Sequence, residues 1–161
     1  MVTESSPPGD ISDTAVYIVH SDPAAHYSVK VLEGWSQTTV GSAVRFTDKL
    51  NSITLSTQSA ATAPTVASAR AVTVPQLQQS EPAFTLKDVT ALTRHAGPVV
   101  LVHYERDSPP NDVTGKVFRE DVYRYMFFHA GTELDVVLSG PTGSDNVDPW
   151  RIVTDSVAWT K

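Results

Sequence analysis

Cysteine is absent from the chain of 161 residues. Its absence excludes disulfides, thiolate metal sites and thiol nucleophiles, but does not decide the compartment, because cysteine-free domains occur in oxidising and reducing environments. No apolar run approaches the roughly 20 residues of a membrane-spanning helix. Met1–Thr14 has neither a basic patch nor an apolar stretch, so it is not a signal peptide as it stands. Two interpretations stay open: a cytoplasmic protein, or an exported and lipid-anchored one whose signal has been trimmed.

Positive charge is also scarce. The chain has 12 Lys and Arg against 18 Asp and Glu, which gives a formal net charge of −6, and the basic residues form no run. A surface that binds nucleic acid or anionic lipid normally needs a basic patch to neutralise phosphates or headgroups. We therefore expect no nucleic-acid partner.

Motifs of known catalytic machinery are missing as well. There is no Gly-x-Ser-x-Gly elbow to expose a nucleophilic serine, and no His-x-x-x-His metal spacing. Ser139–Gly143 is a turn that lacks the lysine and the length of a phosphate-binding loop. Glu120 and Asp121 are neighbours in a predicted strand and point to opposite faces, so they do not form an acid–base pair. We expect neither catalysis nor a cofactor.

Hydrophobic residues make up 40% of the chain, enough for one core. Met1–Thr14, rich in Ser, Thr, Pro, Gly and Asp, is predicted to be a flexible leader, and residues 15–161 a single domain. Short runs of β-branched and aromatic residues predict strands. They cover residues 15–20, 27–32, 37–40, 43–47, 52–57 and 84–95, and the last of these can carry a bulge.

A first helix is predicted after these early strands. Thr62 or Thr65 can cap it, and Pro75 should end it, because proline lacks an amide N–H and clashes with the preceding turn. Its expected buried stripe is Val66, Ala69 and Val72.

A second helix is predicted near the C-terminus. Asp145, Asn146 or Asp148 can cap it, and Pro149 suits its first position. The residues expected to face the sheet recur at helical spacing. They are Val147, Trp150, Val153 and Val157.

Two hairpins give the strongest strand signals. In the first, Ala96-Gly97-Pro98 reverses the chain. In the second, Val122–His129 turns at Ala130-Gly131 into Thr132–Ser139. A two-residue turn there pairs three residues with three across one face: Tyr123 with Leu138, Tyr125 with Val136, and Phe127 with Leu134. Together these elements predict an α+β fold, an antiparallel sheet of about six or more strands packed with helices.

Two segments carry a resemblance to a known family. Tyr27–Trp35 is an extended strand followed by Gly-Trp, and Pro149–Trp159 reads Pro-Trp-Arg-Ile-Val-Thr-Asp-Ser-Val-Ala-Trp. The chain resembles the PsbP/Mog-like fold family from about residue 15 to 159, and among its members the actinobacterial lipoproteins of the LpqN type. It departs at Leu32-Glu33, where the family often has a proline, and it lacks the signal and lipidated cysteine of the lipoproteins.

The resemblance implies an α/β/α sandwich that serves as a non-enzymatic binding or assembly module. It also implies a location in the cell envelope. Fold-level likeness is a weak guide to function, so a metal-dependent hydrolase and a cytoplasmic Mog-like protein-binding adaptor stay open as alternatives.

The hydrolase alternative would use His103 and Glu105, which project from one face of a predicted strand, with Asp107 just beyond and His95 across the hairpin. A zinc ion needs three or four ligands at about 2.0–2.2 Å. An isolated strand histidine is more often a surface or hydrogen-bonded residue, so we expect no metal.

Aromatic side chains of the hairpins can line an apolar groove, although at this spacing they more often form core. The set is Tyr104, Tyr123, Tyr125, Phe127 and Phe128. Met126 and Phe128 lie on the face opposite Tyr125, and an apolar patch left uncovered there would mark an interface. The loop Asp107–Lys116 is expected to be exposed and to add Asn111 and Asp112 to this surface. The predicted partner is a protein or a small apolar ligand.

Overall fold

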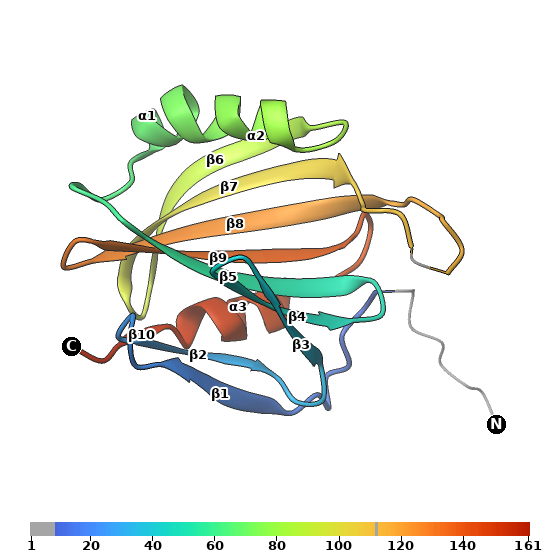
Figure 1. The fold of residues 1–161 in the computed structure, drawn as a ribbon, viewed down its shortest axis with the longest axis horizontal. Helices are drawn as coiled ribbons and strands as arrows, with labels where there is room; N and C mark the ends of the chain where they lie inside the picture. The colour runs from blue at the N-terminus through green and yellow to red at the C-terminus, as the bar shows by residue number, and fades with distance from the viewer. Residues whose placement is uncertain (1–8, 112) are drawn as a thin grey trace.

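A strongly twisted antiparallel sheet organises the molecule (Figure 1). The computed structural model describes residues 9–111 and 113–161. Seven strands form the large sheet in the order β3-β4-β5-β9-β8-β7-β6, and three form a small sheet in the order β1-β2-β10. The strands are β1 (Tyr17–Asp22), β2 (Tyr27–Leu32), β3 (Ser36–Val40), β4 (Ala43–Asp48), β5 (Asn51–Ser59), β6 (Thr85–Arg94), β7 (Gly97–Asp107), β8 (Arg119–His129), β9 (Thr132–Pro141) and β10 (Ala158–Trp159).

Helices lie on both faces of the large sheet. One helical segment consists of α1 (Val66–Ser68), the π-helical turn η1 (Ala69–Thr73) and α2 (Val74–Ser80), and it crosses one face near β6 and β7. The helix α3 (Val147–Asp155) and the small sheet cover the other face. This α+β arrangement confirms the predicted fold class. Within the described residues, no helix is both long and apolar enough to cross a bilayer.

The β8–β9 hairpin has the predicted register. Tyr125 lies opposite Val136, and the flanking pairs follow as expected. Ala130 and Gly131 have φ values of 48° and 81°, and two positive φ values are what a type I′ turn needs to match the twist of the strands. The turn therefore places Tyr123, Tyr125 and Phe127 on the face toward α3.

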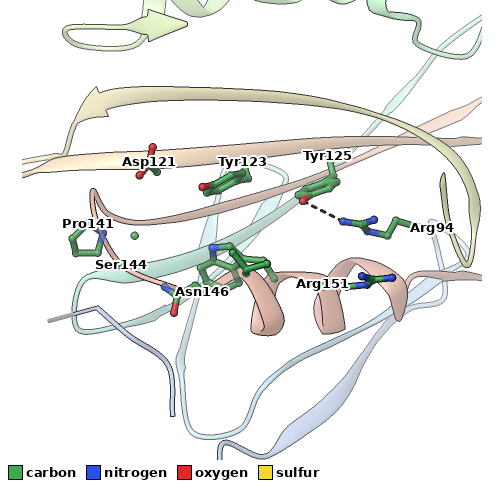
Figure 2. Close-up of a pocket in the computed structure, with 11 residues that line it drawn as sticks. Arg94, Asp121, Tyr123, Tyr125, Pro141, Ser144, Asn146 and Arg151 are labelled. Atoms are coloured by element: carbon green, nitrogen blue, oxygen red, sulfur yellow. Dashed lines mark hydrogen bonds between the residues drawn. The ribbon is translucent and has the colours of Figure 1, made fainter. Parts of the chain in front are cut away.

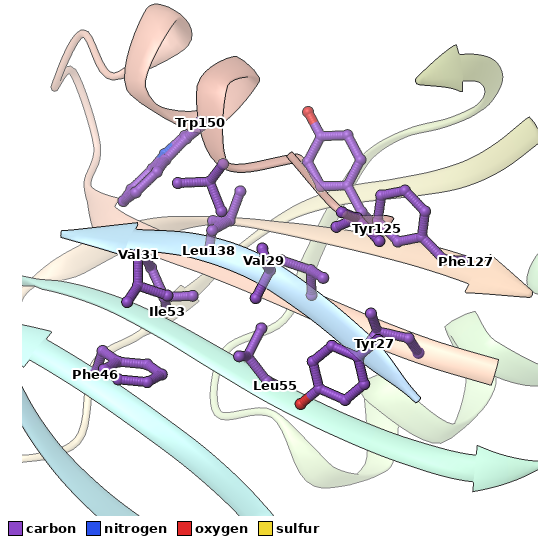
Figure 3. Close-up of a cluster of buried hydrophobic side chains, with 14 of the residues drawn as sticks. Tyr27, Val29, Val31, Phe46, Ile53, Leu55, Tyr125, Phe127, Leu138 and Trp150 are labelled. Carbon is purple, nitrogen blue, oxygen red and sulfur yellow. The ribbon is translucent and has the colours of Figure 1, made fainter. Parts of the chain in front are cut away.

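The main core lies between that face and α3 (Figure 3). The alternation of β2 sends Tyr27, Val29 and Val31 into it, as predicted, and each is at most 2% exposed. Trp150 and Val153 of α3 enter from the helix side. Burial of these side chains stabilises the docked helix by about 25 cal/mol per Å² of apolar surface removed from water.

A smaller core lies on the opposite face, under the α1–α2 segment. Met126 and Val122 of β8 pack there with Tyr104 of β7. Ala69 and Leu77 supply the helical side of the contact. On the face opposite Tyr125, these residues are therefore covered by the helical segment.

Pro75 does not end the helical segment, contrary to the prediction. The turn before it is π-helical, and the N–H of Val74 bonds the carbonyl of Ala69, five residues back. Such a turn is wider than an α-turn, which relieves the clash that proline makes inside an α-helix. The extra residue also moves the buried stripe, so Val74 is buried while Val72 is 53% exposed.

The C-terminal helix differs from its prediction at both ends. Val147 is its first residue but is 69% exposed. Pro149 is the third residue, where its missing N–H is still one of the unbonded donors of a helix start. Val157 is fully buried yet follows the end of the helix at Asp155, so helical spacing alone does not explain it.

Two details of the first hairpin were only partly predicted. The expected bulge in β6 is confirmed between Leu86 and Asp88. The chain reverses at His95 and Ala96, because Arg94 already pairs with Gly97. The turn therefore lies one residue before the predicted Ala96-Gly97-Pro98.

The packed chain begins earlier than residue 15. Residues 1–8 lie outside the described part, but the carbonyl of Gly9 accepts hydrogen bonds from the side-chain amides of Asn51 (2.7 Å) and Asn146 (2.9 Å). The N–H of Ile11 donates to Oδ1 of Asn146 at 2.9 Å. Residues 9–11, which belong to the predicted leader that runs to Thr14, are therefore hydrogen-bonded to two buried asparagines.

We predict that Phe127→Ala lowers the free energy of unfolding by about 3–5 kcal/mol, the usual cost of removing a buried aromatic ring. Phe127 is 1% exposed. Urea denaturation measures the effect. Val113→Ala, at a residue 92% exposed, serves as the control and should change stability by less than about 0.5 kcal/mol. Equal effects of the two substitutions would contradict the described core.

A buried carboxyl lies on the sheet face that carries the smaller core. Asp135 is 3% exposed, and Arg124 Nη2 donates to its Oδ2 at 2.8 Å. Burial raises the pKa of Asp135 to about 7; Arg124 opposes this rise and Glu133 adds to it. Between about pH 4 and pH 7 the carboxyl of Asp135 is therefore protonated in the folded protein and ionised in the unfolded chain.

The free energy of unfolding should therefore fall as the pH rises from about 4 to about 7, because only the native state binds that proton in this window. At about 1.4 kcal/mol per pKa unit, the loss amounts to a few kcal/mol. Urea denaturation across this pH range measures it, and Asp135→Asn should flatten the dependence. Asp48→Asn, at the exposed end of β4, should keep the wild-type slope. An unchanged slope in Asp135→Asn would refute the assignment.

Candidate binding slot between β8 and α3

A slot of about 200 Å³ lies where α3 meets the large sheet (Figure 2). Its floor comes from β8 and one wall from the first turns of α3. One end comes from β6, and the other from the last residues of β9 and the segment that follows it. The lining residues are Arg94, Asp121, Tyr123, Tyr125, Gly140, Pro141, Ser144, Asn146, Val147, Trp150 and Arg151. This volume is below the range of about 300–1,000 Å³ found for pockets that hold drug-sized ligands, so the slot suits a ligand smaller than a typical drug.

Alternate residues of β8 build the floor. Because strand side chains alternate between faces, Asp121, Tyr123 and Tyr125 all point toward α3, in line with Phe127 of the main core. Tyr125 is 6% exposed and Tyr123 is half-buried. The row therefore changes from apolar core to polar surface along one strand, and the slot lies at this change.

Two arginines lie at one end. Arg94 Nε donates to Thr154 Oγ1 at 2.9 Å and lies 3.8 Å from Asp155 Oδ1. Its guanidinium carbon is 5.4 Å from the centre of the Tyr125 ring, a cation–π distance. Arg151 Nε lies 3.5 Å from Asp155 Oδ2. Two cations thus share one carboxylate, which leaves this end with a net positive charge.

A carboxylate lies at the other end. Asp121 Oδ1 is 2.9 Å from His103 Nε2. The His103 ring stacks on Tyr123, with the ring centres 4.2 Å apart and the planes at 10°. The imidazole therefore holds both the carboxylate and the neighbouring phenol in place.

The phenols that face the slot stay protonated. Burial, with Asp121 as the next largest cause, raises the pKa of Tyr123. Burial likewise raises the pKa of Tyr125, against the lowering effect of Arg94. Both hydroxyls are thus hydrogen-bond donors at neutral pH, and neither adds negative charge to the slot.

The last residues of β9 and the segment after it close the end of the slot that holds Asp121. Gly140 needs to be glycine, because a Cβ there would lie 2.5 Å from Asn51 Oδ1. Asn146, 4% exposed, forms the start of α3 and binds residues 9–11. The same asparagine that holds this stretch of chain therefore also shapes the slot.

The predicted binding residues fall elsewhere. Met126 is 2% exposed beneath the α1–α2 segment, so its prediction as a contact residue is wrong for this conformation. Phe128 is half-buried on the same face. Asn111 lies in the exposed loop, where its Oδ1 accepts the N–H groups of Val113 and Thr114. Asp112 lies outside the described residues.

His103 and Glu105, the two residues of the hydrolase alternative, bind different partners. His103 contacts Asp121, whereas Glu105 pairs with Lys87 at 2.5 Å and lies 3.6 Å from Arg119. These cations lower the pKa of Glu105, with the Lys87 hydrogen bond as the main cause. The described residues contain no group of three or more His, Asp or Glu able to hold a metal ion.

Sequence reasoning found part of the slot. Of the five aromatic residues named as groove candidates, Tyr123 and Tyr125 line it, while Tyr104 and Phe127 belong to the cores. The two arginines were missed. Arg94 ends one strand and Arg151 lies on a helix, and only the docking of α3 on the sheet brings them near one carboxylate.

Comparisons with known proteins agree on the fold, which is PsbP-like. The solution structure of CyanoP, the cyanobacterial PsbP of Synechocystis, aligns with a TM-score of 0.64 at 15% identity, covering 94% of this chain and 98% of that one. No family model and no curated protein matches the sequence. The likeness to the LpqN-type lipoproteins thus rests on the sequence segments alone.

Two further solved structures share the architecture. A Bacteroides thetaiotaomicron protein aligns with a TM-score of 0.56 at 11% identity over 89% of this chain, which spans about half (48%) of that longer protein. A Pseudomonas aeruginosa protein of unknown function aligns with a TM-score of 0.50 at 14% identity, covering 84% of this chain and 91% of that one. Identities this low establish the fold alone.

We predict that Asn146→Ala lowers stability by about 1–3 kcal/mol, because the partly buried N–H of Ile11 loses its acceptor and the carbonyl of Gly9 keeps only the hydrogen bond from Asn51. Hydrogen exchange should rise at the Ile11 amide in the same variant. Asn111→Ala is the matched control, since the amides it frees are exposed to water. Unchanged exchange at Ile11 would show that Asn146 does not hold this segment.

Proposed function

We propose that this chain is a non-catalytic binding domain of the cell envelope, and that it holds a small ligand in the slot between β8 and α3. The observation that carries the proposal is the construction of the slot. It has an aromatic middle and oppositely charged ends, as expected of a site in which a few polar groups orient a ligand.

The polar groups of the slot are held by neighbours before any ligand arrives. Thr154 fixes Arg94, and His103 fixes Asp121. A prearranged site loses less side-chain entropy on binding. This supports recognition of a small molecule.

The lining residues favour binding over turnover. They include one carboxylate, Asp121, and no histidine. General acid–base catalysis usually divides its roles between two titratable groups with different environments. The slot walls offer hydrogen-bond donors and aromatic faces, which suit binding, rather than such a pair of titratable groups.

The envelope location rests on the resemblance of Tyr27–Trp35 and Pro149–Trp159 to lipoprotein segments. Fractionation of the native host, with an antibody against this chain, tests it. We expect the protein in the envelope fraction, and recovery in the cytosol would favour the adaptor alternative.

A fragment screen by ligand-observed NMR tests the binding function. Val147→Trp places a large ring at the mouth of the slot, and Ile152→Trp places the same ring on another side of α3, outside the slot. Fragments that bind the wild type should lose binding in Val147→Trp and keep it in Ile152→Trp. The fragments should also be recovered chemically unchanged.

Other results would reject the proposal. Fragments that bind both tryptophan variants equally do not occupy the slot. Enzyme-like conversion of a fragment, or stoichiometric metal that is lost in His103→Ala, would support the hydrolase alternative.

A further inference from the structure

We infer that the slot selects an elongated aromatic carboxylate with a hydrogen-bond donor at its far end. This inference rests on the proposed function and specifies the ligand class. The slot has three parts, which are the arginine end, the aromatic middle and the Asp121 end. Contacts of the described residues define the chemistry of each part.

The arginine end fits a carboxylate. A guanidinium has five N–H donors, and the hydrogen bonds of Arg94 to described residues use Nε and one N–H of Nη2, the latter to Tyr125 at a long 3.5 Å. Donors of Nη1 and Nη2 therefore remain for a planar anion, which arginine binds in a bidentate manner. Arg151, whose side chain is 70% exposed, can close over the same anion from α3.

The middle of the slot fits an aromatic ring. Tyr123 and Tyr125 form its floor and Trp150 its wall. The ring of Tyr123 is held by its stack on His103, and Trp150 is only 5% exposed. Fixed aromatic faces favour a flat ligand, because aromatic rings pair at defined offsets and angles.

The Asp121 end fits a donor and disfavours a second anion. One oxygen of Asp121 contacts His103, and the other can accept a hydrogen bond from a ligand. Because this carboxylate is the one acidic group among the lining residues, its charge sets the preference at this end. A dicarboxylate would bring two negative charges together there.

The two ends set the length of the ligand. Arg94 lies over Tyr125, and Tyr125 and Asp121 are four residues apart on β8, which is roughly 13 Å at about 3.3 Å per residue. A para-substituted ring extended by one glycine-sized linker spans most of this distance. A single amino acid is too short to reach both ends.

Three probes separate these requirements. 4-Aminohippurate carries the carboxylate, the ring and the far donor. Hippurate lacks the donor, and hippurate methyl ester lacks the negative charge as well. Isothermal titration calorimetry of the full chain gives the affinity of each.

We expect the wild type to bind 4-aminohippurate most tightly. Hippurate should bind roughly ten- to a hundredfold more tightly than its methyl ester, the range for a charge-assisted hydrogen bond. Arg151→Gln should weaken binding of the two acids several-fold without weakening the ester. Arg70→Gln, at an exposed arginine in η1 on the opposite face, is the control and should bind like the wild type. Asp121→Asn should reduce the advantage of 4-aminohippurate over hippurate.

Each contrary result overturns a defined part. An ester that binds as well as the acid removes the arginine end from the inference. If 4-aminohippurate binds no more tightly than hippurate, or if it keeps its advantage in Asp121→Asn, the role of the Asp121 end is wrong. If none of the probes binds while Val147→Trp still blocks other fragments, the ligand class is wrong and the proposed function stands. If no compound binds the slot, the proposed function fails.

Discussion

The pairing of β8 with β9 is the constraint on which the rest of the structure depends. Strand side chains alternate, so a slip of one residue would exchange the two faces of the hairpin. The turn at Ala130-Gly131, with both residues at positive φ, prevents that slip. It sends one set of side chains into the main core and the opposite set beneath the α1–α2 segment. The site follows from the same register, because its floor continues the row that begins in the core at Phe127.

The position of the site reflects how α3 meets that row. Trp150 and Val153 enter the main core together with residues of β2, β8 and β9. Tyr123 lies at the edge of this core, and Asp121 lies beyond it. A straight helix and a twisted sheet diverge toward the end of their contact. The slot lies at such an end, where water can reach the polar side chains. The charges at either end are therefore compatible with folding, while an unpaired charge deeper in the core would be costly.

Short-range patterns predicted the sheet well and the site only in part. Alternation in Tyr27–Leu32 and in the β8–β9 hairpin specified both the strands and their buried faces, because each depends on residues close in sequence. The π-turn before Pro75 was not predicted, since its energy depends on how the helix docks on Met126 and its neighbours. The cluster of Arg94 with α3 and the anchoring of residues 9–11 by Asn146 join segments 60 and 135 residues apart, and no local pattern encodes such contacts.

The bulge in β6 has a consequence for the protein at high concentration. β6 is one of the two rims of the large sheet, and an open rim presents unpaired backbone groups to which a strand of another molecule can add. The irregular spacing between Leu86 and Asp88 interrupts that row of groups, and the charged side chain of Lys87 stands at the same place. The other rim, β3, is only five residues long and mostly polar. Both rims of the large sheet are thus poor templates for sheet extension.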